Sequence, residues 1–225
     1  MNNILLITMI SNPYINTILS TNVNLNPRQM DNKIYKYMKD NLIKKVEGKC
    51  FDKYGFVSKV YNIQSYKGGY IHAENPNAAA TFSVKFSCKL CIPLKGKNIV
   101  CKIINIVNET YINSQNGPIT VIVNMNNVNN ELFFRDQRNN KLMYKEKNGS
   151  FSEINTGKYI VVSIQSKTFN NMDVIIMATG TLLRIASDSE IQKTFGEEYK
   201  NTENKTISYD DYIKEEQISI DNLDN

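Results

Sequence analysis

The chain has 225 residues, of which 41% are hydrophobic, and a formal net charge of +5 at pH 7. This length fits two domains of about 80–100 residues and a tail, and no apolar run approaches the ~20 residues of a membrane-spanning helix. Residues 1–187 carry 23 basic and 11 acidic side chains, a net +12, whereas residues 188–225 carry 4 and 11, a net −7. A basic body with an acidic tail predicts an anionic partner, with the tail as its competitor or as a separate docking segment.

The first 13 residues contain an apolar run but do not have the pattern of a signal peptide. The stretch Met1–Ile10 has no basic residue, and Thr8 interrupts its apolar run. Signal peptides have a basic start and a cleavage site of small residues. We interpret residues 1–13 as an N-terminal extension.

Residues 14–93 combine one helical pattern with several strand patterns. Tyr14–Leu25 is rich in β-branched residues and predicts a strand, and Asn26-Pro27 is typical of a helix start. The apolar stripe that follows has helical spacing, and the lysines between its members predict a solvated face. The stripe consists of Met30, Ile34, Met38, Leu42 and Val46.

Further strand patterns follow this helix. Phe56–Ile63 predicts a strand, Lys67-Gly68-Gly69 a turn and Tyr70–His72 a short extended segment. Thr81–Ile92 alternates between apolar and polar residues without a break and predicts a further strand. The order predicts an α+β domain in which the helix covers one face of an antiparallel sheet.

Residues 94–187 contain five apolar runs and little helical pattern. A long polar insertion, Asn126–Thr156, separates the third run from the fourth. Five strands with a long third connection predict a small barrel of the OB type, which commonly binds single-stranded nucleic acid or docks on proteins. The five runs are Asn98–Val107, Glu109–Gln115, Ile119–Asn124, Lys158–Lys167 and Met172–Ile185.

Two of the four cysteines, Cys88 and Cys91, have the spacing of a zinc or redox motif. They fall on the predicted strand Thr81–Ile92, where positions i and i+3 point to opposite faces ~10 Å apart. A disulfide needs Cα atoms within ~7 Å, and no second cysteine or histidine pair completes a tetrahedral site. We therefore expect free thiols in a reducing compartment, with no metal and no cofactor.

The sequence contains no constellation of catalytic residues. His72 is the single histidine, and no serine or cysteine is paired with a second base. No glycine-rich loop opens a helix, and the adjacent carboxylates Asp210 and Asp211 lie in the acidic tail. A small enzyme on a barrel scaffold is therefore disfavoured, and polymerase chemistry in particular needs clustered acidic metal ligands.

A short loop with two glycines, Val46–Phe56, separates the helical pattern from the next strand, and its order of residues is distinctive. Together with six other segments, it resembles the stalk subunit of multisubunit RNA polymerases, a family that includes the seventh-largest subunit of eukaryotic polymerase II and its archaeal counterpart. The resemblance runs from Tyr14 to Ser187. The other matching segments are Leu25-Asn26-Pro27-Arg28, Gly69-Tyr70-Ile71, Pro93-Leu94-Lys95-Gly96, Val107-Asn108, Gly117-Pro118 and Ala178-Thr179-Gly180-Thr181.

The resemblance implies a non-catalytic subunit with a tip domain (residues 14–93) and an OB-fold domain (residues 94–187). The tip domain would dock on the polymerase core near the clamp, against the largest subunit and a small core subunit. A small helical partner would complete the stalk, although some viral polymerases lack one. The core contact carries over to Gly48, Lys53, Tyr54 and Gly55, with Gly68 and Gly69 in a neighbouring loop. A half-buried aromatic at a strand end is the alternative interpretation of Tyr54.

The OB-fold domain implies a contact with nascent single-stranded RNA during initiation and RNA guidance. Where the family usually has a glycine and then an aromatic, this chain has Tyr111 and Asn113, so backbone electrostatics is the expected binding mode. The candidate RNA-binding residues are Tyr111, Arg135, Arg138, Lys141, Lys145 and Lys147.

Two further expectations concern source and alternatives. Asparagine accounts for 32 residues, which is typical of an AT-rich genome such as that of a large cytoplasmic DNA virus or of some protists. The expected location is the nucleus for a cellular protein, or the host cytoplasm and virion for a viral one. A free-standing OB-fold RNA-binding protein is the alternative function. Residues 188–225 lack sustained periodicity, and we expect them to be disordered.

Overall fold

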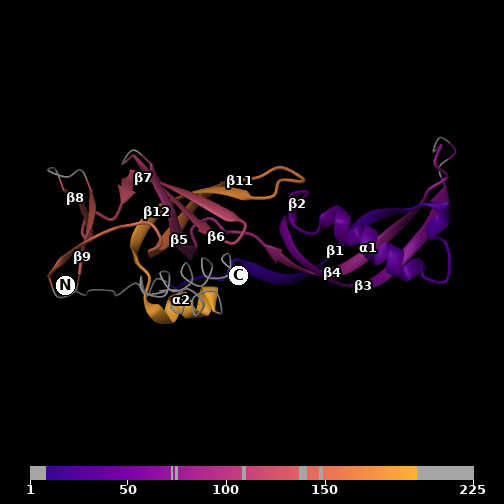
Figure 1. Cartoon of the computed structure of the whole chain (residues 1–225), viewed down its shortest axis with the longest axis horizontal. Coiled ribbons are helices and arrows are strands. Elements are labelled where there is room, and N and C mark those ends of the chain that lie inside the picture. Colours follow the sequence, from indigo (N-terminus) through magenta and orange to yellow (C-terminus); the bar gives the residue numbers. More distant parts are fainter. Residues whose placement is uncertain are drawn as a thin grey trace, which may run out of the picture. The chain divides into compact units, whose positions relative to one another are not determined.

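The computed structural model describes residues 9–71, 73, 76–107, 110–136, 141–146 and 149–196. By its internal contacts the chain divides into two units, residues 1–185 and residues 186–225. The first unit contains two hydrophobic cores, one under a four-stranded sheet and one inside a closed five-stranded barrel (Figure 1). Few helices, mostly strands and a closed barrel agree with the expected α+β architecture.

The N-terminal sheet has the strand order β1-β4-β3-β2, and all its pairs are antiparallel. Helix α1 contributes three buried residues of the predicted stripe, Met38, Leu42 and Val46, to the sheet's core. The helix begins later than predicted, because Asn26-Pro27 starts a separate 3-10 turn, and Met30 is exposed. The elements are β1 (Tyr14–Leu25), η1 (Pro27–Gln29), α1 (Ile34–Val46), β2 (Lys49–Phe51), β3 (Gly55–Ile71) and β4 (Ala80–Cys91).

The prediction of a turn at Lys67-Gly68-Gly69 is wrong, because these residues lie within strand β3. It is a single strand of 17 residues, paired with β4 from Phe56 to Ile71. Gly68 and Gly69 have φ of 103° and 100° and lie at one of four register shifts along this pair. A bulge of this kind accommodates positive-φ glycines inside a paired strand. Because β4 pairs with β3 on both sides of the bulge, the two glycines stay within the strand and do not form a turn. His72 lies outside the described residues.

The five strands predicted for residues 94–187 are confirmed and close into a barrel in the order β11-β12-β7-β6-β5. The insertion, expected to be only a polar connection, contains a small three-stranded sheet that covers part of the barrel core through Phe133 and Ile154. The barrel strands are β5 (Asn98–Val107), β6 (Tyr111–Asn116), β7 (Ile119–Val128), β11 (Tyr159–Thr168) and β12 (Ile176–Ile185). The insertion holds β8 (Phe133–Arg135), β9 (Leu142–Lys145) and β10 (Phe151–Glu153).

The four cysteines are buried free thiols, and β4 confirms the predicted strand. Cys88 belongs to the core of the N-terminal sheet, whereas Cys91 belongs to the barrel core. Burial raises the pKa of Cys88 to about 11 and that of Cys91 to about 12. Among the described residues, no three His, Cys, Asp or Glu side chains are grouped as a metal site.

The second unit begins with a helix where disorder was expected. Helix α2 (Asp188–Phe195) follows a capping box in which Ser187 and Glu190 satisfy each other's backbone N–H groups. This local capping explains why the expectation of disorder is wrong for these eight residues. The remaining residues of the acidic tail, 197–225, lie outside the described part of the chain. No described helix combines the length and apolarity needed to cross a membrane.

Candidate functional site

The loop Val46–Phe56, which is predicted to contact the polymerase, joins α1 to β3, and we call it the contact loop. Gly48 ends the helix with φ of +75°, and β2 then leads into a tight turn in which Asp52 has φ of 47°. Lys53 and Tyr54 are exposed at this turn, and Tyr54 retains 42% of its accessible surface. The Tyr54 ring stacks on Phe51, with 6.1 Å between the ring centroids. Tyr54 is therefore both accessible and held in place.

A hydrogen bond to β3 and a close approach to β4 fix this loop. A carboxylate oxygen of Glu47 accepts the backbone N–H of Val60 on β3 at 2.7 Å, beside a register shift in the β3–β4 pair. Gly55, with φ of 130°, lies so close to β4 that a Cβ atom would be 2.7 Å from the carbonyl oxygen of Cys91. A loop constrained in this way presents its side chains with little conformational freedom, which suits a binding surface.

The same loop is joined to the connection between β11 and β12 of the barrel. The backbone N–H of Cys50 donates to the carbonyl of Asp173 at 2.7 Å, and Met172 donates to the carbonyl of Cys50 at 2.8 Å. The backbone N–H of Asp52 donates to the Asn171 side chain at 2.9 Å. Sequence reasoning missed this junction, because its partners lie 119 or more residues apart and no local pattern couples them.

Gly68 and Gly69 do not lie beside the contact loop, contrary to the prediction. Phe56, which follows Gly55, pairs with Cys91 of β4, whereas Gly68 pairs with Phe82. These two positions are nine residues apart on β4, which corresponds to roughly 30 Å of extended strand. The structure thus groups Gly48, Lys53, Tyr54 and Gly55 and places the glycine pair at the other end of the sheet.

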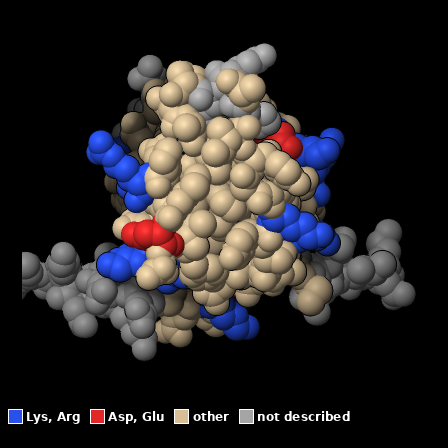
Figure 2. All heavy atoms as spheres, turned by 90° about the vertical axis from the view of Figure 1, so that its right-hand side faces the viewer, with Lys and Arg blue, Asp and Glu red and all other residues tan. Residues whose placement is uncertain are grey.

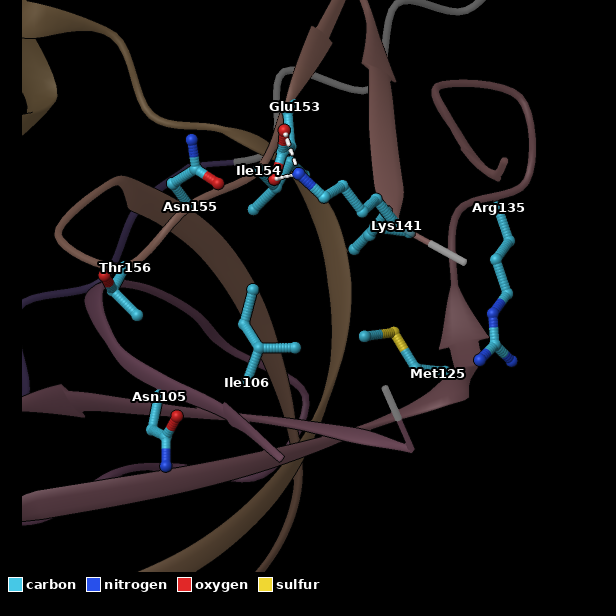
Figure 3. A pocket seen from close by; sticks show the side chains of 10 residues that line it. Asn105, Ile106, Met125, Arg135, Lys141, Glu153, Ile154, Asn155 and Thr156 are labelled. Atoms are coloured by element: carbon cyan, nitrogen blue, oxygen red, sulfur yellow. Dashed lines mark hydrogen bonds and ion pairs between the residues drawn. The ribbon is translucent and has the colours of Figure 1, made fainter. Parts of the chain in front are cut away.

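The basic candidates of the barrel domain are only partly brought together. A groove of about 330 Å³ opens between the barrel and the three-stranded sheet, and Arg135 and Lys141 line it (Figure 3). The Lys141 ammonium forms an ion pair with Glu153 at 2.9 Å, drawn as dashed lines in Figure 3. Lys145 ends β9 and is not part of this lining. Arg138 and Lys147 lie outside the described residues.

The groove also contains residues that the sequence did not indicate. Its apolar floor is formed by Ile106 and Met125, and its polar rim includes Asn105, Asn155 and Thr156 (Figure 3). Two exposed aromatics in the insertion, Phe134 and Phe151, form an edge-to-face pair with ring centroids 4.9 Å apart. The adjacent phenylalanines at 133 and 134, inside a polar segment, were the available signal.

Strand β6 places Tyr111 and Asn113 two residues apart, so both side chains point to the outside of the barrel. Tyr111 is 38% exposed, and Asn113 is partly buried with an Oδ1 atom that has no hydrogen-bond partner in the described structure. Neither residue lines the groove. Tyr111 is therefore the accessible ring on this part of β6, and Asn113 offers only a small amide.

Comparison with known proteins matches the N-terminal region to one domain family. Residues 20–76 fit the family described as "SHS2 domain found in N terminus of Rpb7p/Rpc25p/MJ0397". A putative DNA-directed RNA polymerase subunit of Acanthamoeba polyphaga mimivirus is 34% identical over 179 residues, covering 80% of this chain and 86% of that protein. The DNA-directed RNA polymerase II subunit RPB7 of Glycine max is 27% identical over 122 residues, covering 54% and 68%. The same subunit of Saccharomyces cerevisiae is 27% identical over 119 residues, covering 52% and 67%.

Proposed function

The chain belongs to the Rpb7-like family of stalk subunits of multisubunit DNA-directed RNA polymerases, and we propose that its tip domain attaches it to the polymerase core. The observation that supports this role is the loop around Lys53 and Tyr54, which exposes a cation and an aromatic ring on a rigid backbone. Exposed aromatic residues on rigid supports are typical interface anchors, and a neighbouring cation adds electrostatic complementarity to an acidic partner surface. The expected neighbours are the largest subunit at the clamp and a small core subunit.

In this proposal the subunit is non-catalytic and acts in initiation and in guiding nascent RNA. Its place would be the nucleus in a cellular enzyme, or the host cytoplasm and virion in a viral one. The alternative of a free-standing RNA-binding factor finds no support in the comparisons, since the relatives from mimivirus, Glycine max and Saccharomyces cerevisiae are all named as polymerase subunits. A small helical partner subunit is compatible with this assignment.

The core contact is tested by replacing the exposed pair of the loop. Lys53→Ala combined with Tyr54→Ala should leave the isolated protein folded and weaken its association with the polymerase core by about 1–4 kcal/mol. The matched control is Tyr35→Ala with Lys36→Ala, which removes the same residue types from the exposed side of α1. Co-purification with tagged core enzyme is the measurement. Unchanged incorporation of the Lys53–Tyr54 variant would place the docking surface elsewhere.

We further propose that the barrel domain contacts nascent RNA through its groove and its exposed cations. Arg135 lies at the groove, Lys145 ends the neighbouring strand, and Lys141 is already neutralised by Glu153. Arg135→Gln with Lys145→Gln should reduce the salt slope of single-stranded RNA binding by about 1.4, at about 0.7 for each lost phosphate contact. An unchanged slope would remove these two residues from the RNA contact.

A further inference from the structure

On the face of the N-terminal sheet that points away from α1, the charged residues contributed by strands β1, β3 and β4 are all lysines. Strands β1, β3 and β4 contain no aspartate or glutamate along their full length. Residues on one side of these strands pack with α1 into the core, and four lysines alternate with them on the other side. We call this surface the lysine face; its lysines are Lys59, Lys67, Lys85 and Lys89, all exposed.

Two of these lysines lie so close across the sheet that their positive charges repel each other. Lys59 lies directly opposite Lys89 on the neighbouring strand, a pairing that destabilises a sheet when both residues carry the same charge. Within the described structure, no carboxylate forms an ion pair with any of the four. The Lys89 ammonium lies 4.8 Å from the centre of the Tyr14 ring. An anion bound across the strands would turn this unfavourable arrangement into a favourable one.

One end of the lysine face has a shallow hollow of about 230 Å³. Tyr70 forms part of its wall and is 74% exposed. The ring packs against Gly68, which has no side chain to obstruct it; a Cβ atom at that position would be only 3.3 Å from two carbons of the Tyr70 ring. The positive-φ glycine thus lets the ring lie against the strand. The hollow is lined by Asn22, Lys67, Gly68, Tyr70, Thr81 and Ser83.

A second tyrosine lies further along the same face. The hydroxyl of Tyr61 donates to the side chain of Asn16 at 3.4 Å, and Tyr61 is 36% exposed. Asn16 pairs with Lys89 and points to the same side. At the end of the domain shown in Figure 2, Lys and Arg side chains project around the edge with acidic side chains among them, and uncharged residues fill the middle. Basic side chains, accessible rings and small polar groups therefore share one surface of the sheet.

We propose that the lysine face binds single-stranded RNA through its phosphates, with Tyr70 and Tyr61 available to stack on bases. Aromatic rings inside a basic face are the usual binding surface for single-stranded nucleic acid, because phosphates bind the cations and bases stack on the rings. An acidic peptide would bind through the cations alone and would leave the rings without a role. Lys67 and Lys89 are six β4 residues apart by register, which spans roughly 20 Å and suits several nucleotides. This site lies on a different domain from the barrel groove and does not depend on RNA binding there.

The test compares two charge-matched variants of the full-length protein. The first, Lys59→Gln/Lys85→Gln/Lys89→Gln, removes three cations from the lysine face. The control, Lys33→Gln/Lys36→Gln/Lys44→Gln, removes three exposed cations from α1 and the residue before it. A fluorescein-labelled uridine 20-mer is titrated by anisotropy between about 50 and 200 mM salt. The first variant should bind about 10- to 100-fold more weakly at ~0.1 M salt, with a salt slope smaller by about 2, and the control should match the unmodified chain.

Three results would overturn the proposal. These are equal losses in both variants, no loss in the first variant, and a loss in the first variant for a glutamate 20-mer but not for RNA. Lys59→Arg/Lys85→Arg/Lys89→Arg should restore RNA binding, and failure of this rescue at an unchanged melting temperature would also overturn it. RNA binding by the barrel is tested separately with the Arg135→Gln/Lys145→Gln variant. If that variant binds RNA as well as the unmodified chain, a loss of RNA binding in the lysine-face variant still supports the lysine face.

Discussion

Gly55 allows a direct calculation of what holds the contact loop against the sheet. Its φ of 130° lies where residues with a side chain are rarely found, which costs on the order of 1–3 kcal/mol for alanine. An alanine Cβ would also lie 2.7 Å from the Cys91 carbonyl oxygen and 3.1 Å from the Ile92 Cβ. Because the oxygen belongs to the backbone of β4, no side-chain rotation relieves the overlap. We expect Gly55→Ala to lower the free energy of unfolding by about 3 kcal/mol.

The assay is urea unfolding followed by far-ultraviolet circular dichroism. With an m-value of about 2 kcal/mol/M, a loss of about 3 kcal/mol moves the midpoint down by about 1.5 M. Gly48→Ala is the matched control, because Gly48 also has a positive φ but nothing lies within 4 Å of its added Cβ. That change should cost about 1–2 kcal/mol. A midpoint for Gly55→Ala equal to or above that of Gly48→Ala would refute the close packing of the loop against β4.

The remaining predictions concern the loop, the thiols and the tail. Glu47→Ala should lower the free energy of unfolding by about 1–3 kcal/mol, because the buried Val60 N–H loses its acceptor, while Glu47→Gln should cost less in the same urea assay. Burial raises the pKa of the Cys101 thiol from 9.0 to about 12. The native thiols should therefore stay protonated and react slowly with a thiol reagent at pH 9, whereas urea-unfolded protein should react at once. Because the unfolded thiols lose their protons first, the thiol contribution to the free energy of unfolding should be constant below pH 9 and fall as the pH rises from 9 to 12. Elemental analysis should find no stoichiometric zinc, and one tightly bound equivalent would contradict the strand assignment of Cys88 and Cys91. Deleting residues 197–225, which carry nine acidic and three basic side chains, should tighten RNA binding at low salt and less so at high salt, and equal affinities throughout would exclude the tail as a competitor.

Local periodicity alone was enough to predict the elements whose pattern is complete within a few residues. The alternation in Thr81–Ile92 predicted β4 and, through it, opposite directions for Cys88 and Cys91, because side-chain direction in a strand depends only on residue spacing. The apolar stripe likewise predicted the buried face of α1. The order of motifs around Gly48–Phe56 indicated the family, and the comparisons confirmed it.

Features that depend on contacts between distant residues were decided by the tertiary structure. A positive-φ glycine pair is typical of a turn, but pairing with β4 kept Gly68 and Gly69 inside one long strand and thereby separated them from the contact loop. Hydrogen bonds from Cys50 and Asp52 join that loop to residues 171–173, and the Lys141–Glu153 ion pair neutralises a predicted RNA contact. The lysine face also needs the register of β3 and β4, since lysines far apart in the chain become neighbours only when these two strands pair.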